Sequence, residues 1–427
     1  MSRKVTSSPS LAPVAAGGLL DRRLFLTRGI GLAAAGAFAS NAHAAPLDVP
    51  NWSKIPGESF RAYGEPSKFT VPSLKRAIGQ PYGQLAPGAG AAFTPLQVLH
   101  GTITPSSLHF ERSHSGVPDI DPAKHRLIIH GLVKRALSFD LDSLLRYPMV
   151  NRTMFIECSG NSFFQTFTEA QQIPVGMLNG LVSCSEWTGV MLSTLLDEAG
   201  VDPKGAWILA EGADSAGMSR SIPMEKALDD VMIALYQNGE PIRPEQGYPI
   251  RLVLPGFEGN MSVKWLRRIK VTEGPTHTKD ETSKYTDLLP DGKALQFTYV
   301  MGVKSVITRP SPTLKMGAPG YYEISGLAWS GAGKIKKVEV SADGGKTWAD
   351  AALQEPVLDK SLVCFRVPWK WDGAPVLLAS RATDEKGRVQ ESREKWKAQF
   401  SPANIYHYNA IQTWKVDADG EVKNVFA

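Results

Sequence analysis

The sequence predicts an α+β domain over residues 94–294, followed by a β-sandwich over residues 295–427. The first observation is length, because 427 residues that are 43% hydrophobic and 21% charged suffice for two packed globular domains. The second is the mixture of strand-like and helical runs in the first region. The third is a change near Ala294 to short strand-like runs separated by frequent turns, which is typical of a sandwich.

Residues 1–44 have the pattern of a twin-arginine export signal. The segment Asp21–Leu26 (DRRLFL) precedes a weakly apolar run, Gly29–Phe38, and the small-residue cleavage pattern Ala42–Ala44. The apolar run is too short for an ordinary membrane anchor. The sequence therefore predicts export of the folded protein to the periplasm and no membrane span in the mature chain. Whether cleavage follows Ala44 stays open.

Residues 45–93 are rich in proline and glycine, which predicts a loosely wrapped lead-in segment. Its last part, Leu85–Phe93 (LAPGAGAAF), is expected to be a flexible approach to the first domain.

Elements of the first domain follow from periodicity and end signals. Asp140 is expected to cap a helix that Pro148 ends. The expected strands are Leu127–Leu132 and Arg251–Leu254, and the expected helices are Asp140–Tyr147 and Met191–Ala199.

In the second domain, Asp343-Gly344-Gly345 supplies the residues that a hairpin turn with positive φ needs, and Trp348 is expected to cap the core beside it. The expected strands are Tyr322–Leu327, Ile335–Val340, Val363–Val367 and Val376–Ala382.

Charge argues against nucleic acid as a partner. The whole chain has 47 basic and 42 acidic residues. The first 44 residues hold five basic residues and one acidic residue, so 42 basic and 41 acidic residues remain without them. A net charge near +1 gives no electrostatic footprint for a phosphate backbone.

Three cysteines are too few for a disulfide framework in an exported protein, although one bridge stays open. We interpret Cys184 as a packing residue and Cys364 as structural or exposed. No CxxCH motif and no cysteine cluster occurs, so neither haem nor an iron–sulfur centre is predicted in this chain. A redox function would need a separate electron-transfer partner.

Cys158 stands where the apolar run of Met154–Asn161 (MFIECSGN) stops and a loop of small residues begins. A strand fixes the direction of the sulfur, and small neighbours leave room, which suits a thiolate metal ligand. The alternative is an inert cysteine in the core.

Several separated segments resemble the sulfite oxidase family of molybdenum enzymes, and within it the sulfane dehydrogenases of bacterial sulfur oxidation. They are Phe110–Pro118 (FERSHSGVP), IECSGN around Cys158, Asn238–Lys270, Glu281–Leu289 (ETSKYTDLL), Ser305–Pro312 (SVITRPSP) and Ile411–Val422 (IQTWKVDADGEV). The resemblance implies a molybdopterin-binding catalytic domain, an immunoglobulin-like domain that forms a homodimer, and a molybdenum-molybdopterin cofactor.

The resemblance also implies roles for residues near the metal. Cys158 would bind molybdenum, Arg112 would bind substrate, Tyr285 would be the active-site tyrosine and His114 would contact the cofactor. A guanidinium suits its role because it stays charged and can pair with two oxygens of a sulfur oxyanion. The competing interpretations are a surface salt bridge of Arg112 with Glu111, and surface positions for His114 and Tyr285.

The remaining cofactor-binding residues implied by the resemblance are Asp214, Gln246, Arg251, Ser262 and Lys264. Gln246 and Ser262 stand where animal sulfite oxidases carry histidine, so the pocket is expected to be less cationic and less suited to free sulfite. For Arg251 and Lys264, the alternative is that they simply flank apolar strands, as we expect for Arg267 and Arg268.

The predicted function is molybdenum-dependent oxidation of sulfane sulfur on a carrier-protein cysteine, with electrons passed to a c-type cytochrome subunit. One alternative is a periplasmic sulfite dehydrogenase that acts on free sulfite. The other is a metal-free periplasmic binding or interaction protein with the same fold.

Overall fold

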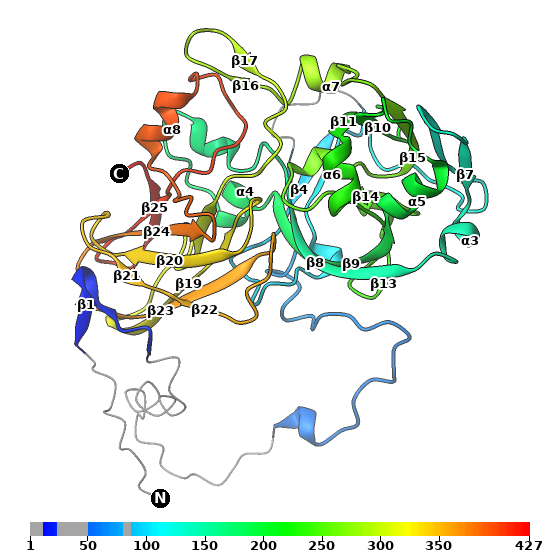
Figure 1. Cartoon of the computed structure of the whole chain (residues 1–427). Helices are drawn as coiled ribbons and strands as arrows, with labels where there is room; N and C mark the ends of the chain where they lie inside the picture. Colours follow the sequence, from blue (N-terminus) through cyan, green and yellow to red (C-terminus); the bar gives the residue numbers. More distant parts are fainter. Residues whose placement is uncertain (1–11, 24–49, 80–86) are drawn as a thin grey trace, which may run out of the picture.

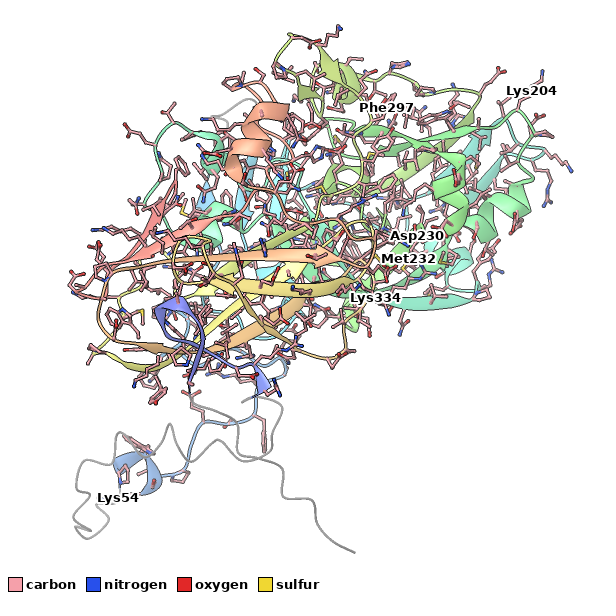
Figure 2. The ribbon with its side chains drawn as sticks, turned by 60° about the vertical axis from the view of Figure 1, so that its left-hand side comes forward. Lys54, Lys204, Asp230, Met232, Phe297 and Lys334 are labelled. Carbon is pink, nitrogen blue, oxygen red and sulfur yellow. The ribbon has the colours of Figure 1, made fainter. Side chains whose placement is uncertain are left out.

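The computed structural model describes residues 12–23, 50–79 and 87–427 (Figure 1). The apolar run and the cleavage pattern of the predicted export signal lie outside these residues. In the described parts, no helix is long and apolar enough to cross a membrane. Residues 50–79, which include Lys54, run largely apart from the two packed domains (Figures 1 and 2).

The first domain is built around two larger sheets and a small one, and short helices connect their strands. One sheet has the order β11 (Ser219–Pro223), β10 (Trp207–Gly212), β15 (Leu266–Thr272), β6 (Leu127–Gly131) and β7 (Leu137–Phe139). The second is β13 (Glu240–Pro241), β12 (Met232–Gln237), β9 (Val182–Met191) and β8 (Met149–Glu157), with β14 (Arg251–Val253) on β12. The small sheet is β3 (Ala77–Gly79), β4 (Gly90–Phe93) and β5 (Glu111–Ser113). The helices are α3 (Leu141–Leu144), α4 (Val175–Asn179), α5 (Leu192–Ala199), α6 (Met224–Asp229) and α7 (Lys279–Thr282).

The second domain is a sandwich of two antiparallel sheets. One contains β1 (Pro13–Ala15), β2 (Leu19–Leu20), β23 (Val363–Trp371), β19 (Gly320–Trp329) and β18 (Lys304–Arg309), with β22 (Ala352–Leu353) on β23. The other is β21 (Ala349–Asp350), β20 (Ile335–Ser341), β24 (Val376–Asp384), β25 (Thr413–Val416) and β26 (Val422–Val425). The pair β16 (Asp287–Leu288) and β17 (Ala294–Leu295) precedes the sandwich, and α8 (Arg393–Gln399) follows β24. The predicted α+β domain and β-sandwich are thus confirmed.

Local signals account for several element ends. Asp140 accepts a hydrogen bond from the Ser143 backbone N–H, as predicted for a cap, yet the helix behind it ends at Leu144 instead of Tyr147. Only one turn of helix, Leu141–Leu144, forms before Pro148, because the chain enters β8 at Met149. Gly344 and Gly345 both have positive φ, as the hairpin prediction requires.

One prediction was wrong. The end of the lead-in segment is not a flexible approach, because Gly90–Phe93 forms β4 between β3 and β5, with Ala91–Phe93 buried. Small residues indicate a loop, but here Gly90–Phe93 pairs antiparallel with a strand on each side. Cys364 was predicted to be structural or exposed, and the structure supports the first alternative, since Cys364 is buried on β23. All three cysteines are buried and free, so no disulfide forms.

The hydrophobic core is continuous between the domains. The core of the sandwich includes Trp329 and Trp369, and it extends to Phe155 of β8 and Cys184 of β9. A separate cluster of apolar side chains, including Ile156 and Trp187, surrounds Cys158. Strand β8 therefore carries Cys158 at a fixed place between both cores.

Candidate active site

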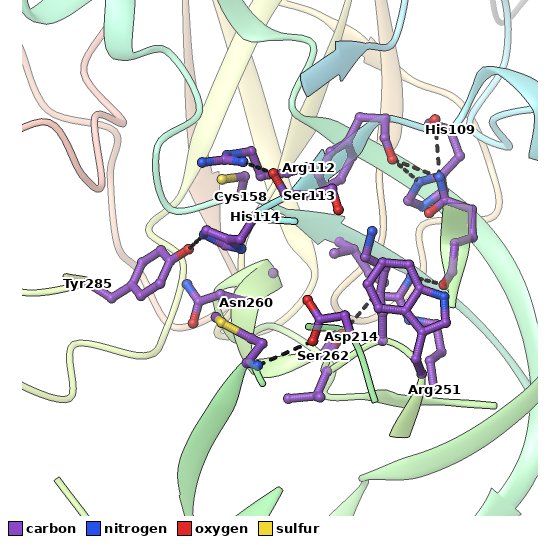
Figure 3. Close-up of a pocket in the computed structure, with 18 residues that line it drawn as sticks. His109, Arg112, Ser113, His114, Cys158, Asp214, Arg251, Asn260, Ser262 and Tyr285 are labelled. Atoms are coloured by element: carbon purple, nitrogen blue, oxygen red, sulfur yellow. Dashed lines mark hydrogen bonds between the residues drawn. The ribbon is translucent and has the colours of Figure 1, made fainter. Parts of the chain in front are cut away.

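All nine residues predicted for the site line one pocket of the first domain (Figure 3). They arrive from β5, from the loop after β8, from the loop after β10, from β14 and its flanking loops, and from the segment after α7. The nine are Arg112, His114, Cys158, Asp214, Gln246, Arg251, Ser262, Lys264 and Tyr285.

Cys158 lies immediately after the last residue of β8, and two backbone hydrogen bonds hold it. Its N–H donates to Leu181 at 2.9 Å, and its carbonyl accepts from the Asn161 N–H at 2.8 Å. Burial raises the pKa of the Cys158 thiol to about 11. The thiol therefore needs a bound cation to become a thiolate, which is what coordination to a metal provides.

Arg112, His114 and Tyr285 converge near this sulfur (Figure 3). The guanidinium of Arg112 donates to the Gly90 carbonyl at 3.2 Å and to the Ser113 carbonyl, and the Tyr285 hydroxyl lies 2.8 Å from His114 Nε2. Burial, and then the charge of Arg112, lowers the pKa of His114 to about 3. Burial also raises the pKa of Tyr285 well above its usual value. A protonated phenol therefore donates to a neutral imidazole at neutral pH.

The backbone at Tyr285 has φ of 55°, an uncommon conformation for a bulky side chain. The phenol lies in the pocket, where its ring is buried against the rings of His114 and Tyr406 and the guanidinium of Arg220.

Two cations, the buried Arg251 and the partly buried Lys264, lie at the other end of the pocket. Arg251 donates to the carbonyls of Gln246 and Ser262, both at 2.9 Å, and Lys264 donates to the carbonyl of Glu245 at 2.9 Å. Their charges face aromatic rings, with Arg251 5.1 Å from the Trp187 centroid and Lys264 4.3 Å from that of Trp265. Burial lowers the pKa of Arg251 to about 9 and that of Lys264 to about 7.

Neither cation has a carboxylate within salt-bridge distance among the residues that the structure describes. The Nε atom of Arg251 is buried, and no hydrogen-bond acceptor in the described chain reaches it. Buried charges without a counter-charge are costly unless a ligand of opposite charge binds. This end of the pocket fits an anionic group, such as the phosphate of a pterin.

Gln246, Ser262 and Asp214 carry no positive charge. The Gln246 amide donates to the Phe110 carbonyl at 2.9 Å, and the Ser262 hydroxyl accepts from the Leu254 N–H at 3.1 Å. Asp214 accepts from the Ser115 hydroxyl at 3.2 Å. The protein thus already uses part of the hydrogen-bonding capacity of each residue, and the remainder faces the pocket.

The chain matches two family descriptions: an oxidoreductase molybdopterin-binding domain over residues 114–279, and a Mo-co oxidoreductase dimerisation domain over residues 295–414. Its fold is similar to the crystal structure of the sulfane dehydrogenase SoxCD from Paracoccus pantotrophus, with a TM-score of 0.86 and 46% identity. That match covers 88% of this chain and 97% of the other.

The chain belongs to the sulfite oxidase family of molybdopterin oxidoreductases.

Other members are more distant and longer. Mitochondrial sulfite oxidase of Mus musculus is 31% identical over 295 residues, which are 65% of this chain and 53% of that protein. An NADH nitrate reductase of Phaseolus vulgaris is 35% identical over 298 residues, which are 62% of this chain and 34% of that protein. The chain therefore spans about half of the mouse enzyme and a third of the plant enzyme.

As in the rest of the family, the cofactor is molybdenum-molybdopterin, and the pocket fits it. Cys158 is the thiol that lines the pocket, and the buried cations at the far end suit the pterin's anionic group. In the described chain, no group of three or more His, Cys, Asp or Glu side chains is arranged to hold a metal ion. The dithiolene of the cofactor would therefore complete the ligands that Cys158 begins.

Sequence reasoning missed a group of charged residues behind the metal end of the pocket. Arg220 donates to Glu258 at 2.8 Å, and His407 lies 3.6 Å from the second oxygen of that carboxylate. The other ring nitrogen of His407 lies 2.7 Å from Asp287. Although burial opposes it, the hydrogen bond to Asp287 and the nearby charges of Asp287 and Glu258 raise the pKa of His407 to about 10. Arg220, Glu258 and Asp287 are buried and His407 is largely buried, and the two cations lie beside the two carboxylates.

This charged group contacts Tyr285, which lines the pocket, directly. The Arg220 guanidinium lies 5.1 Å from the centroid of the Tyr285 ring, and the Tyr406 ring lies 5.5 Å from it. The backbone N–H of His407 donates to the backbone carbonyl of Ser159 at 2.8 Å, next to Cys158. Glu258 lies within the Asn238–Lys270 segment that carried the resemblance, so its signal was available. Tyr406 and His407 belong to a distant segment with no local motif, and only the fold brings them here.

His109 and Asn260 also line the pocket and were not predicted. Burial lowers the pKa of His109 to about 3, and its Nδ1 atom lies 3.0 Å from the Phe110 carbonyl. Its Nε2 atom and the Asn260 amide oxygen are buried without a hydrogen-bond partner in the described chain, so both can serve a bound cofactor.

Proposed function

We propose that this enzyme oxidises sulfane sulfur carried on the cysteine of a partner protein and passes the electrons to a c-type cytochrome. The likeness to SoxCD, at 46% identity over 97% of that chain, supports the sulfane substrate class. The length of the chain alone would not support this substrate class, since the match to mouse sulfite oxidase covers only about half of that protein.

The observation that carries the proposal is the charge at the metal end of the pocket. Among the described residues that line the pocket, Arg112 is the cation beside His114, which is held neutral, and Gln246 and Ser262 carry no charge. A persulfide on a protein cysteine bears a single negative charge at its outer sulfur, which one guanidinium balances. Sulfite is a dianion near neutral pH, and one guanidinium would leave half of its charge uncompensated in a buried site.

The chain's own residues orient the substrate. Arg112 attracts the outer sulfur, and Tyr285, aligned by His114, offers a hydrogen bond to the oxygen that forms on it. When bound, the molybdenum cofactor supplies oxygen-atom transfer and takes up two electrons. Each turnover joins one oxygen atom from water to sulfur and releases two protons and two electrons, which a cytochrome accepts one at a time.

We also propose that the protein acts in the periplasm, exported folded by the twin-arginine route, as a homodimer through its second domain. The Asp21–Leu26 segment supports the route because it has the twin-arginine pattern. That export path accepts a folded protein that already holds its cofactor. The match of residues 295–414 to a dimerisation domain supports the dimer.

The substitution Cys158→Ser tests catalysis. The purified protein should keep its fold and oligomeric state, lose bound molybdenum and lose turnover with a persulfide-loaded carrier protein and ferricytochrome c. Retained molybdenum and activity would refute the ligand role.

A comparison of sulfur donors distinguishes the proposed activity from that of a sulfite dehydrogenase, the alternative that the likeness to mouse sulfite oxidase favours. With wild-type enzyme, carrier-bound sulfane should give a higher kcat/KM than free sulfite, and the reverse order would establish the alternative. A protein matured with active cofactor synthesis that holds no molybdenum would support a binding protein instead.

A further inference from the structure

The segment just before the twin-arginine pair is folded onto the sandwich. Residues Pro13–Ala15 form β1, a single 3-10 turn covers Ala16–Gly18, and Leu19–Leu20 forms β2. Strand β2 pairs antiparallel with β23 through Leu19 and Trp369, at the edge of the six-stranded sheet. Figures 1 and 2 both show this segment lying against the sandwich.

The segment contacts the sandwich through both buried apolar side chains and hydrogen bonds. Leu19 and Leu20 are 0% and 1% exposed, and Leu19 belongs to the sandwich core. The Trp369 indole donates to the Gly17 carbonyl at 2.6 Å, and the Ala16 N–H donates to the Thr347 hydroxyl at 3.1 Å. Both a side chain buried in the core and backbone hydrogen bonds therefore hold the segment.

The two glycines make the fit selective. Gly17 and Gly18 have φ of 72° and 86°, a region that favours glycine. A Cβ atom on Gly18 would overlap the Lys370 carbonyl oxygen, and one on Gly17 would lie 2.6 Å from Ala342 Cβ. A sequence with larger side chains at these positions could not approach β23 in this way.

We infer that the edge of β23 around Trp369 is a strand-binding groove whose ligand is the chain's own segment Pro13–Leu20. Such addition of a strand to a sheet edge is a common mode of peptide recognition. The groove exists only in the folded sandwich, so the segment docks only after the second domain has folded. Docking places Arg22 and Arg23 at the surface of that folded domain, where Arg22 lies 3.7 Å from Asp350.

The functional consequence rests on the proposed export. Removal of residues 1–44 would take the strand away, uncover Trp369 and leave the edge of β23 without its partner. The precursor and the processed enzyme would then differ on the surface of the dimerisation domain. The docking itself does not depend on export, because it can be measured in the purified, unprocessed chain.

The test uses the full chain and hydrogen exchange of β23. The double substitution Leu19→Asp and Leu20→Asp should release the segment, so amide exchange near Trp369 accelerates at least about tenfold and indole fluorescence shifts to the red. Gly18→Val should have the same effect through backbone overlap alone. Arg22→Ala is the matched control, and it should leave exchange unchanged because that ion pair is half exposed.

A peptide of residues 12–23 added to the Leu19→Asp/Leu20→Asp protein should restore slow exchange near Trp369, and the same peptide carrying Gly18→Val should not. Unchanged exchange in the double variant would overturn the inference, as would failure of the peptide to restore protection. Loss of protection throughout β18–β26 would also overturn it, since the segment would then be an integral strand and not a removable ligand. None of these outcomes depends on activity, so they are distinct from failure of the proposed function.

Discussion

The two ends of the pocket treat buried charge in opposite ways. At the end proposed for the pterin, the buried Arg251 and the partly buried Lys264 lie against aromatic rings and backbone carbonyls, with no carboxylate in salt-bridge distance in the described chain. Behind the end that holds Cys158, the buried Arg220 and the largely buried His407 are matched by Glu258 and Asp287.

This difference separates binding from support. Cations without a nearby counter-charge raise the energy of the empty pocket and recover it when an anion binds, so this end of the pocket favours an anionic ligand. Opposite charges placed side by side offset the cost of one another's burial and fix the position of the residues they touch. Burial lowers the pKa of Arg251 and that of Lys264, whereas the carboxylates beside His407 raise the pKa of His407. The pKa shifts thus have opposite signs at the two ends.

The largest expected effect comes from breaking the compensated group. Glu258→Gln keeps the side-chain shape but leaves Arg220 and His407 without their shared carboxylate. The free energy of unfolding should fall by about 3–5 kcal/mol, as for removal of one partner from a buried ion pair. Urea denaturation monitored by circular dichroism measures the loss. Glu323→Gln, which breaks a half-exposed pair with Arg366, is the control and should cost less than about 1 kcal/mol. Equal losses in the two variants would contradict the comparison.

At the uncompensated end, Arg251→Met should act on the cofactor and not on the fold. Removing a buried cation without a counter-charge should leave the cofactor-free chain as stable as wild type or more so. Affinity for the cofactor should fall about 10–100-fold, in line with the loss of a supporting contact at a metal site. Molybdenum content after dialysis and urea denaturation of the cofactor-free protein check both halves. A destabilised cofactor-free protein that still retains molybdenum would reverse the roles assigned to the two ends.

Sequence reasoning reached the pocket but not its support, and the reason is physical. Cys158, Arg112 and Tyr285 face a ligand, so their chemistry constrains the residues next to them and leaves a local pattern. His407 and Asp287 meet although they are 120 positions apart, and although Asp287 lies in the Glu281–Leu289 segment that carries the resemblance, His407 would look like an ordinary surface residue in its own segment. The same applies to Gly90–Phe93, where small residues indicate a loop until two neighbouring strands are known. Strand positions in the sandwich were predictable because alternation of apolar residues reports burial directly.

Titration offers a third way to sharpen the comparison. The pKa of His407 is raised from 6.5 to about 10, so its stabilising effect is complete below pH 6.5 and is lost as pH rises through 10. The difference in unfolding free energy between wild type and His407→Gln should be constant at low pH and shrink between these values. The slope should approach about 1.4 kcal/mol per pH unit. Urea denaturation from pH 6 to pH 10 measures it, and a gap that widens with pH would show that His407 is not charged in the folded protein.

The smallest expected effect belongs to Tyr285, which lines the pocket and also contacts Arg220 of the charged group behind it. Tyr285→Phe removes the hydroxyl that pairs with His114 but keeps the ring that faces Arg220. Stability should therefore change by less than about 1 kcal/mol, whereas kcat/KM should fall about tenfold through loss of one hydrogen bond to the forming oxygen. Most of that loss should appear in kcat, because the hydrogen bond strengthens as charge develops on the oxygen. His114→Ala, which leaves the phenol in place but frees it to rotate, should lower kcat less than Tyr285→Phe does. A Tyr285→Phe enzyme that loses stability and keeps kcat would place the tyrosine with the supporting charges instead of with the substrate.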